Sequence, residues 1–475
     1  MKLKYIASLL SVALMLTSCE SILEIDPPTD SLTADVTFST PEGIRSAATG
    51  FYTENFLNNI MYYQALEMYV SQISDELKAR SGQFAEYYQN NYNASSSYIS
   101  NLWTTPYSSI YGANDFLKHV KGSTIIPESE LNKYRGEALF FRANAYFYLV
   151  NLFGDVPLLT TSDVKVTAMA PRAPKKEVYE QIISDLKQAQ LWLQDSGNGH
   201  TRVSVDAVTA LLARVYLYTE QWDKAVDEAN KLLPVADGGM GSNYQLETID
   251  RVFLASSKEA ILQSNQEGFI GTGSYMGFTR IGVMFIPSAR ATYASYYFSD
   301  ELVNDLRSNP DDKRNQWIGE KIGSGGKTYY YPYKYKNATT PNSSVDYEFY
   351  VIFRLAEQYL IRAEANVHLG NMEQAVADIN KIRERAGLED YSGGMSQNDL
   401  LMEIESQRRK EFFFEQGHRW FDLNRTGRAD AVYGQTSYKK MNWKSYKSLL
   451  PIPEQQIGRN RNLTQNPGYS SEQEK

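Results

Sequence analysis

The chain has 475 residues, 42% of them hydrophobic and 22% charged, and this composition excludes extensive disorder, collagen and coiled coil as the main structure. An excess of 56 acidic over 48 basic residues argues against a general nucleic-acid binder, and a single cysteine excludes a disulfide framework or a cysteine metal cluster. The 35 tyrosines exceed what packing usually demands and favour a recognition surface.

The N-terminus has the pattern of a bacterial lipoprotein signal. A short basic start is followed by an apolar stretch over residues 5–16, which is too short to span a bilayer. Residues 16–19 then read LTSC, which resembles the site where the cysteine is lipidated and becomes the new N-terminus. We therefore expect residues 1–18 to be removed and Cys19 to carry the lipid. An ordinary secretory peptide with a chance cysteine is the weaker alternative.

Long amphipathic segments follow the signal, and their apolar period predicts helices. One of them, residues 131–153, is aromatic on nearly every face, which is typical of a buried helix, and it stops at the glycine and proline of 154–157. The predicted helices are residues 41–58, 131–153, 175–193, 204–219 and 222–233.

One internal repeat is visible. Residues 211–232 read LLARVYLYTEQWDKAVDEANKL, and residues 361–382 read IRAEANVHLGNMEQAVADINKI. Each copy carries two alanines twelve positions apart, Ala213 and Ala225 in the first, which lets two antiparallel helices approach closely as in a tetratricopeptide hairpin. Because the copies lie far apart in the chain, we expect two helix pairs embedded in a larger body rather than a continuous solenoid.

Two regions are rich in Tyr, Asn and Ser without a helical period, residues 79–101 and 234–350. They predict short strands, hairpins and ordered loops, and they hold much of the tyrosine surplus. A tyrosine ring can stack on the apolar face of a sugar while Asn, Arg and Asp bond its hydroxyls. The loops are therefore candidates for a binding site that performs no chemistry.

Two sequence patterns resemble enzyme motifs but do not meet the requirements of those motifs. Residues 323–328 read GSGGKT, but a phosphate loop needs a glycine where this chain has Lys321, and a strand follows instead of a helix, which predicts a hairpin turn. A glycosidase needs two carboxylates across a cleft, whereas Asp311-Asp312 and Glu389-Asp390 are adjacent pairs on turns. We expect no enzymatic activity and no cofactor. Carboxylates and carbonyls of the loops could hold a structural calcium, but the chain has no twelve-residue calcium loop and none is predicted.

Residues 401–425 form the densest charged and aromatic segment, LMEIESQRRKEFFFEQGHRWFDLNR. On one helix, Arg408 would share a stripe with Glu411 and Glu415, and buried charges must be paired. We therefore predict a structural ion-pair network in which Arg408 lies near Glu411 or Glu415, and the other arginines near the aspartate or those glutamates; an active-site charge cluster is the alternative. The predicted members are Arg408, Glu411, Glu415, Arg419, Asp422 and Arg425.

Five stretches together resemble one family, the SusD/RagB outer-membrane nutrient-binding lipoproteins of Bacteroidetes. The most specific are the Phe-Gly-Asp-Val-Pro turn, the arginine- and glutamate-rich segment and the closing LLPIPEQQIGRNRNLTQNPGY. In the second of these, Gln416 stands where glycine often follows the glutamate directly, so that Gly417 is shifted by one. The matching stretches are residues 19–29, 102–117, 135–160, 408–425 and 449–469.

The resemblance implies a mostly α protein in which tetratricopeptide-like helix pairs form a scaffold and a loop-rich region with short strands carries the ligand site. It implies an outer-membrane, surface-exposed lipoprotein that captures oligo- or polysaccharide and passes it to a SusC-like TonB-dependent transporter. The predicted divisions are a signal peptide at 1–18, a tether at 19–34, an N-terminal helical region at 35–233 and a C-terminal region at 234–475, the last with a loop-rich insertion at 234–350 and a helical signature at 351–430.

The family's binding residues come from loops that differ among members, so candidates are chosen by position in the loops 79–98 and 268–297. Arginine would donate to sugar hydroxyls and the rings would stack. The candidates are Arg80, Tyr87, Tyr88, Tyr92, Tyr275 and Tyr296, with Trp317 as an outsider. The runner-up function is a tetratricopeptide-like lipoprotein that binds protein or peptide with aromatics on a concave helical face; a glycoside hydrolase is less favoured.

Overall fold

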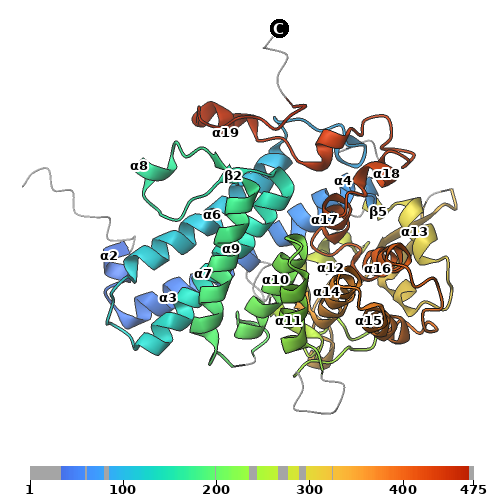
Figure 1. Cartoon of the computed structure of the whole chain (residues 1–475), viewed down its shortest axis with the longest axis horizontal. Coiled ribbons are helices and arrows are strands. Elements are labelled where there is room, and N and C mark those ends of the chain that lie inside the picture. Colours follow the sequence, from blue (N-terminus) through green and yellow to red (C-terminus); the bar gives the residue numbers. More distant parts are fainter. Residues whose placement is uncertain are drawn as a thin grey trace, which may run out of the picture.

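The computed structural model describes residues 34–58, 61–79, 85–197, 199–234, 243–265, 277–287, 296–323 and 325–469. The predicted signal peptide, Cys19 and the predicted tether up to residue 33 lie outside the described residues. Within them the chain is mostly helical with small sheets, as predicted (Figure 1).

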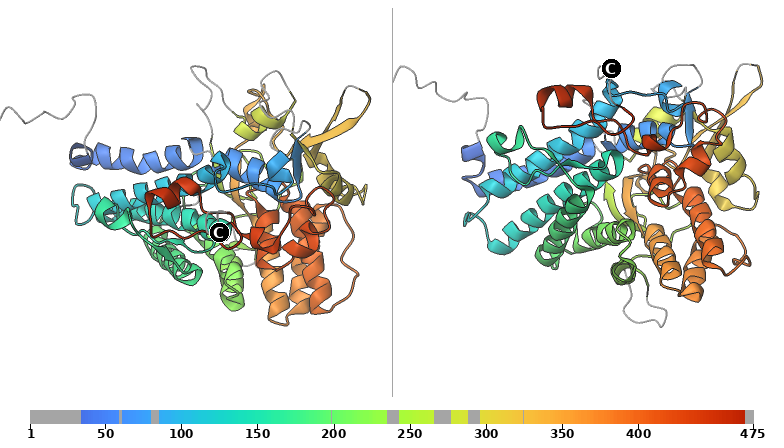
Figure 2. Two further views of the ribbon diagram at one scale, coloured as in Figure 1. Left: turned by 90° about the horizontal axis from the view of Figure 1, so that it is seen from above. Right: turned by 45° about the horizontal axis from the view of Figure 1, so that its top comes forward.

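The scaffold is a row of helices that pack in the order α6, α7, α9, α10, α11, α14, α15 and α16 (Figures 1 and 2). The helices predicted over 131–153, 175–193, 204–219 and 222–233 are confirmed to within three residues. Their bounds are α6 (Ser97–His119), α7 (Glu128–Phe153), α9 (Lys175–Leu193), α10 (Val205–Tyr218), α11 (Trp222–Leu232), α14 (Leu355–His368), α15 (Met372–Arg385) and α16 (Gln397–Phe412).

Helix α3 (Pro41–Tyr52) lies along α6 and α7 and continues as a π-helical segment, η2 (Thr53–Asn58). Together, α3 and η2 span the helix predicted over 41–58. Shorter helices cover the ends of the scaffold and the loop region. They are α2 (Ala34–Thr37), η3 (Met61–Val70), α4 (Ser71–Ile73), α5 (Ala85–Tyr88), α8 (Val164–Thr167), α12 (Arg280–Phe285), α13 (Asp300–Leu306), η4 (Lys313–Trp317), η5 (Ser344–Asp346), α17 (His418–Arg425), α18 (Ala429–Tyr433), η6 (Ser445–Ser448) and α19 (Glu454–Arg459).

Helix α7 is the centre of the scaffold because it is buried nearly all round. It starts after Pro127 with Glu128 in its first turn, where a carboxylate favours the helix dipole. It ends at Gly154, whose φ of 75° is one that glycine adopts without strain. A Cβ at this position would also lie 2.9 Å from the side chain of Leu449, so the turn that closes α7 requires glycine.

The two copies of the sequence repeat form the hairpins α10–α11 and α14–α15, and the alanines twelve positions apart are fully buried in both. Contrary to our expectation of two separately embedded pairs, α11 packs directly on α14. The Arg362 guanidinium on α14 donates to Asn230 Oδ1 on α11 at 2.7 Å. The segment between the hairpins leaves the row, and the chain returns at α14 to continue the stack.

Four two-stranded antiparallel sheets occur in the described part of the chain. The β6–β7 pair is a hairpin that projects from the body (Figure 2), with Ile322 opposite Thr328 across the GSGGK turn. This confirms the interpretation of residues 323–328 as a hairpin turn. The pairs are β1 (Leu77–Ala79) with β5 (Tyr296–Phe298), β2 (Val156–Pro157) with β3 (Arg172–Ala173), β4 (Ala260–Ser264) with β8 (Tyr350–Arg354), and β6 (Ile318–Ile322) with β7 (Thr328–Pro332).

The single helix expected over the charged segment is wrong, because α16 ends at Phe412 and α17 begins at His418. Between them the backbone turns through positive φ at Phe414, Gln416 and Gly417. Non-glycine residues pay roughly 1–2 kcal/mol for this conformation, so other contacts must hold the turn. The phenylalanine side chains of the turn are buried in the core, and its glutamate points to the ion cluster described next.

A buried ion cluster surrounds Arg354, the residue that joins β8 to α14. Its guanidinium donates to Glu415 at 2.9 Å, to Glu259 at 2.9 Å and to Glu411 at 2.5 Å. Arg385, Arg314 and Lys334 also pair with these glutamates, and every one of the pairing side chains is almost completely buried. The nearby cations hold the pKa of the Glu411 carboxyl well below its usual range despite burial.

All six residues of the predicted network are paired, and all but Arg425, whose side chain is 10% exposed, are buried. Most partners differ from those expected. Arg408 pairs with Asp422 at 2.7 Å rather than with a glutamate, because the turn after Phe412 carries Glu415 to Arg354. Arg419 was expected to pair with Asp422 or those glutamates, and it pairs with Asp75 at 2.8 Å instead. Arg425 does pair with Asp422, at 2.9 Å, and also with Glu364 at 2.5 Å.

The cluster gives a stability prediction. Arg354→Met would leave three buried glutamates short of their shared cation, and we expect a loss of about 3–5 kcal/mol in the free energy of unfolding, measured by urea denaturation. The control is Arg45→Met, which removes the half-exposed pair with Glu130 and should cost much less, because water screens an exposed ion pair. Equal losses in the two variants would contradict the role given to Arg354.

Glu67 gives a pH prediction. It is buried in η3, where Tyr350 and the backbone N–H of Gln416 donate to its Oε1, and burial raises its pKa to about 8. The unfolded chain releases this proton near the ordinary value of 4.5. The folded protein therefore loses stability as pH rises from 4.5 to 8. Glu67→Gln removes this loss. The free energy of unfolding of the variant minus that of wild type, measured by urea denaturation, should therefore increase as pH rises from 4.5 to 8. A difference that does not change with pH would contradict the raised pKa.

Candidate functional site

Strands β1 and β5 bring together two segments more than 200 residues apart in the chain. Their antiparallel register pairs Leu77 with Phe298 and Ala79 with Tyr296. The end of β1 and the start of β5 therefore lie at the same edge of this small sheet. Ala79 and Tyr296, one from each of the two loops that the sequence singles out, are thus direct neighbours.

A shallow cavity of about 150 Å³ lies between this sheet and the β6–β7 hairpin. Tyr297 and Tyr329 pack inside it with ring centroids 4.5 Å apart, and Tyr330 lies under the Arg307 guanidinium at 4.4 Å. Its volume is below the roughly 300–1,000 Å³ of enclosed small-molecule pockets, so a larger ligand would lie across an open surface. The lining residues are Lys78, Ala79, Tyr297, Phe298, Asp300, Lys327, Thr328, Tyr329 and Tyr330.

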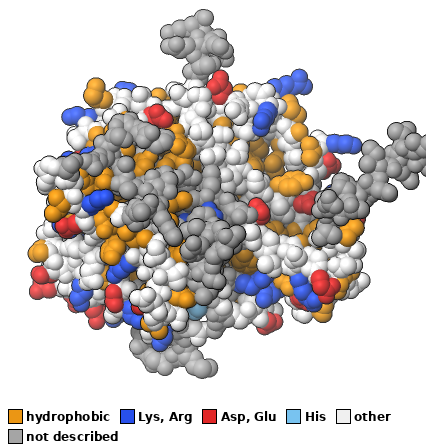
Figure 3. Space-filling view, turned by 180° about the vertical axis from the view of Figure 1, so that it is seen from behind, with side chains coloured by type: hydrophobic (Ala, Val, Ile, Leu, Met, Phe, Trp, Pro, Cys, Tyr) orange, Lys and Arg blue, Asp and Glu red, His pale blue; other side chains and the backbone are white. Residues whose placement is uncertain are grey.

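Beside the cavity, Tyr88 and Tyr438 meet edge to face at 6.0 Å, and the Lys78 ammonium lies 4.7 Å from the Tyr438 ring. Burial raises the pKa of the Tyr438 hydroxyl, so this group keeps its proton. These side chains are partly exposed, as are those of the hairpin tyrosines. We call Lys78, Tyr88, Tyr329, Tyr330 and Tyr438 the tyrosine surface. Figure 3 shows that hydrophobic side chains, a class in which tyrosine is counted, gather in patches on the face of the molecule seen from behind.

Lys439 fixes the position of Tyr88. Its ammonium is completely buried and donates to the carbonyl oxygens of Gln72 at 2.8 Å and Tyr88 at 2.8 Å, and to Asn90 Oδ1 at 2.7 Å. These acceptors lie on the chain before β1 and at the end of α5. One side chain from the C-terminal half therefore holds both ends of the segment that contains β1.

Four of the predicted binding rings are not exposed, and the expectation that they present an open face is wrong. Tyr87, Tyr92, Tyr296 and Trp317 are at most 5% exposed. The first of them lies on the short helix α5, which turns its ring against neighbouring tyrosines, and Trp317 donates its ring N–H to a backbone carbonyl in the core at 2.9 Å. A ring buried in this way has no face on which a sugar could stack.

Among the described candidates, Tyr88 alone reaches the surface, while Arg80 and Tyr275 lie outside the described residues. The sequence reasoning missed Tyr329, Tyr330 and Tyr438 as binding candidates. For the first two a signal existed, because consecutive tyrosines on an exposed hairpin must place rings on both faces. Nothing local marks Tyr438, which is placed by tertiary contacts.

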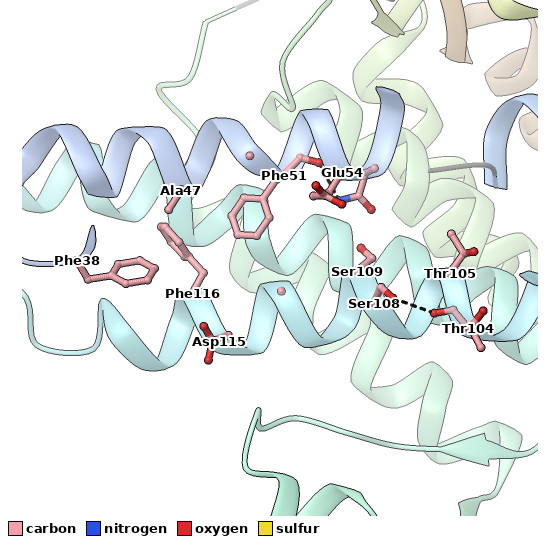
Figure 4. Close-up of a pocket in the computed structure, with 13 residues that line it drawn as sticks. Phe38, Ala47, Phe51, Glu54, Thr104, Thr105, Ser108, Ser109, Asp115 and Phe116 are labelled. Carbon is pink, nitrogen blue, oxygen red and sulfur yellow. Dashed lines mark hydrogen bonds between the residues drawn. The ribbon is translucent and has the colours of Figure 1, made fainter. Parts of the chain in front are cut away.

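The helical scaffold has its own cavities, one of which is shown in Figure 4. This groove of about 450 Å³ runs between α3 and α6, with Phe38, Phe51 and Phe116 on its floor and hydroxyl side chains along α6. Ser108 donates to the Thr104 carbonyl at 3.2 Å, so its hydroxyl is engaged in its own helix.

The described residues contain no group of three or more side chains placed to hold a metal ion. In the same part of the chain, no helix combines the length and apolar character needed to cross a bilayer. Asp300 is the one carboxylate among the residues that line the cavity at the tyrosine surface, so that cavity lacks the carboxylate pair of a glycosidase.

Comparison with known proteins agrees with this geometry. A family model described as the SusD family matches residues 293–469, and one described as starch-binding and associating with the outer membrane matches residues 22–217. SusD-like protein P2 of Formosa agariphila is 27% identical over 98% of this chain and 100% of the relative. The starch-binding protein SusD of Bacteroides thetaiotaomicron is 26% identical over 75% of this chain and 76% of its own length.

Solved structures share the fold. A SusD superfamily protein from Bacteroides vulgatus superimposes with a TM-score of 0.77 at 20% identity, covering 91% of this chain and 99% of the other. A laminarin-binding SusD-like protein superimposes with a TM-score of 0.72 at 23% identity, covering 90% of this chain and 100% of the other.

Proposed function

The chain belongs to the SusD family, and on this basis we propose that it is a lipid-anchored glycan-binding protein of the cell surface that passes oligosaccharide to a TonB-dependent outer-membrane transporter. The names of its relatives support a glycan ligand, since one binds starch and a structural neighbour binds laminarin. The observation that carries the proposal is the pairing of β1 with β5, which places partly exposed tyrosines from distant segments on one face.

The tyrosine surface suits a sugar chain for a physical reason. A sugar ring has an apolar C–H face and a rim of hydroxyls, and a tyrosine offers a flat ring with a polar tip. The Lys78 ammonium supplies a donor for the hydroxyls, and the Asp300 carboxylate, 3.4 Å from it, supplies an acceptor. Binding of this kind needs no acid, base or nucleophile, so we propose a carrier rather than an enzyme.

The anchor is the second part of the proposal. The lipoprotein pattern at residues 16–19 would place acyl chains on Cys19, and each buried methylene adds about 0.8 kcal/mol of membrane affinity. A lipid on this residue, followed by the predicted tether, would hold the folded body close to an outer-membrane transporter.

The ligand site can be tested on the hairpin. Tyr329→Ala with Tyr330→Ala removes two partly exposed rings, and ring contacts worth about 0.5–1.5 kcal/mol each predict an affinity about tenfold lower. Affinity gels with starch, laminarin and other polysaccharides would identify a ligand, and calorimetry would measure its affinity.

The matched control is Tyr111→Ala, because Tyr111 is 53% exposed on α6, away from this face. It should leave both affinity and melting temperature unchanged. If the hairpin variant keeps its melting temperature and binds the polysaccharide as well as wild type, the tyrosine surface is not the site.

The anchor is tested by Cys19→Ser. Without the thiol no lipid can be attached, so the variant should appear in the soluble fraction after a high-salt wash of the membranes, whereas wild type should stay in the outer-membrane pellet. Circular dichroism of the variant provides the control for folding. A variant that pellets with the membranes as wild type does would refute lipidation at this residue.

A further inference from the structure

We propose that the saccharide bound by the tyrosine surface is acidic, and that its carboxylate or sulfate groups pair with Lys321 and Lys327 of the β6–β7 hairpin. This inference rests on the proposed function, because it names the chemical class of the ligand at the same site. The chain as a whole has a net charge of −8, so an anionic ligand binds only where cations are in local excess. The hairpin provides such an excess.

The two faces of the hairpin differ in charge. Residues directly opposite each other in an antiparallel pair of strands project from the same face of the sheet. Lys321 lies opposite Tyr329, and Glu320 lies opposite Tyr330. The face with Tyr329 therefore bears a lysine, whereas the face with Tyr330 bears a carboxylate. That carboxylate is already paired with the Arg307 guanidinium.

Lys327 adds a second cation beside Tyr329. It lies in the turn of the hairpin, and its ammonium is 5.4 Å from the centroid of the Tyr329 ring. Both hairpin lysines are exposed, and neither pairs with a carboxylate in the part of the chain that the structure describes. Lys78 differs from them, since Asp300 lies 3.4 Å from its ammonium. Two lysines and one carboxylate therefore line the cavity of the tyrosine surface, which leaves an excess of positive charge.

A lysine beside an exposed aromatic ring suits an acidic sugar. When a sugar stacks its C–H face on a tyrosine, its substituents project outward around the aromatic ring. The flexible four-carbon stem of Lys327 lets its ammonium move to an acidic substituent, to which it offers three N–H donors. Hydrogen bonds between ionised groups are stronger than those to neutral hydroxyls. An acidic sugar therefore uses the unpaired lysines, whereas a neutral sugar leaves their charge unmatched.

The test compares Lys321→Gln/Lys327→Gln with wild type by calorimetry. The substitutions remove both charges and keep amides that still bond hydroxyls. The probes are oligomers of galacturonate, oligomers of a sulfated galactan, and neutral oligomers of starch and laminarin. We expect an acidic oligomer to bind, and the double variant to bind it about tenfold more weakly because two ion pairs are lost. Raising the salt concentration to about 0.5 M should weaken wild-type binding, because salt screens exposed charges.

The matched control is Lys118→Gln/Lys121→Gln. Both lysines are exposed, at and just after the end of α6, and neither pairs with a carboxylate among the described residues. This variant therefore loses the same charge at a different place, and it should bind the acidic oligomer as wild type does. Melting temperatures of both double variants check that the fold is unchanged. Equal weakening of binding in the two variants would show an effect of overall charge and would overturn the role given to the hairpin.

The variant Tyr329→Ala/Tyr330→Ala, measured with the same probes, separates failure of this inference from failure of the proposed function. If this variant weakens binding of a neutral oligomer and the hairpin lysine variant changes nothing, the acidic ligand is overturned while the tyrosine surface stands. If only the lysine variant weakens binding of an acidic oligomer, the tyrosine surface is overturned and the ligand class stands. Absence of binding by both acidic oligomers also overturns the acidic ligand.

The two acidic probes identify the group that is recognised. Binding of the galacturonate oligomer without the sulfated one supports a carboxylate ligand, and the reverse result supports a sulfate ester. Binding of both, weakened in each case by the loss of the hairpin lysines, supports recognition of the negative charge itself.

Discussion

The structure depends on one buried constraint, the pairing of Arg354 with three glutamates. Arg354 lies where β8 passes into α14, and its partners are Glu259 directly before β4, Glu411 in the last turn of α16 and Glu415 in the turn after α16. Charges removed from water are tolerated only when every one of them is matched. The cluster therefore fixes where α16 must stop, how the following turn runs, and how the helical scaffold meets the strands of the loop region.

This ion cluster explains why the turn at 413–417 contains non-glycine residues with unfavourable positive φ angles. A continuous helix would have kept Glu411 and Glu415 on one stripe, but both carboxylates reach the same guanidinium from a helix end and a turn. Gly417 allows the turn to close, since a Cβ there would lie 2.7 Å from Val70. The gain from matched buried charge outweighs the local strain.

The proposed tyrosine surface and the helical scaffold are built differently. The tyrosine surface is formed by segments that the β1–β5 pairing, Lys439 and the packing of β7 on β5 bring together. The scaffold is formed by helices that pack on their neighbours in chain order.

The sequence by itself determined the features that depend on neighbours in the chain. Helix periodicity and the stop at Gly154 placed several of the scaffold helices, and the hairpin turn at 323–328 followed from its glycines and from the strand after it. Motifs indicated the family, and the charge density of 401–425 required ion pairs. Only the tertiary structure decided the partners, because Asp75 and Arg354 lie far from that segment in the chain.

The tertiary structure also decided which rings are exposed. Tyr87 and Tyr88 are adjacent and chemically identical, yet a helical step of about 100° buries Tyr87 and leaves Tyr88 partly exposed. Burial depends on contacts between segments that are distant in the chain, and such contacts cannot be predicted from a local sequence pattern.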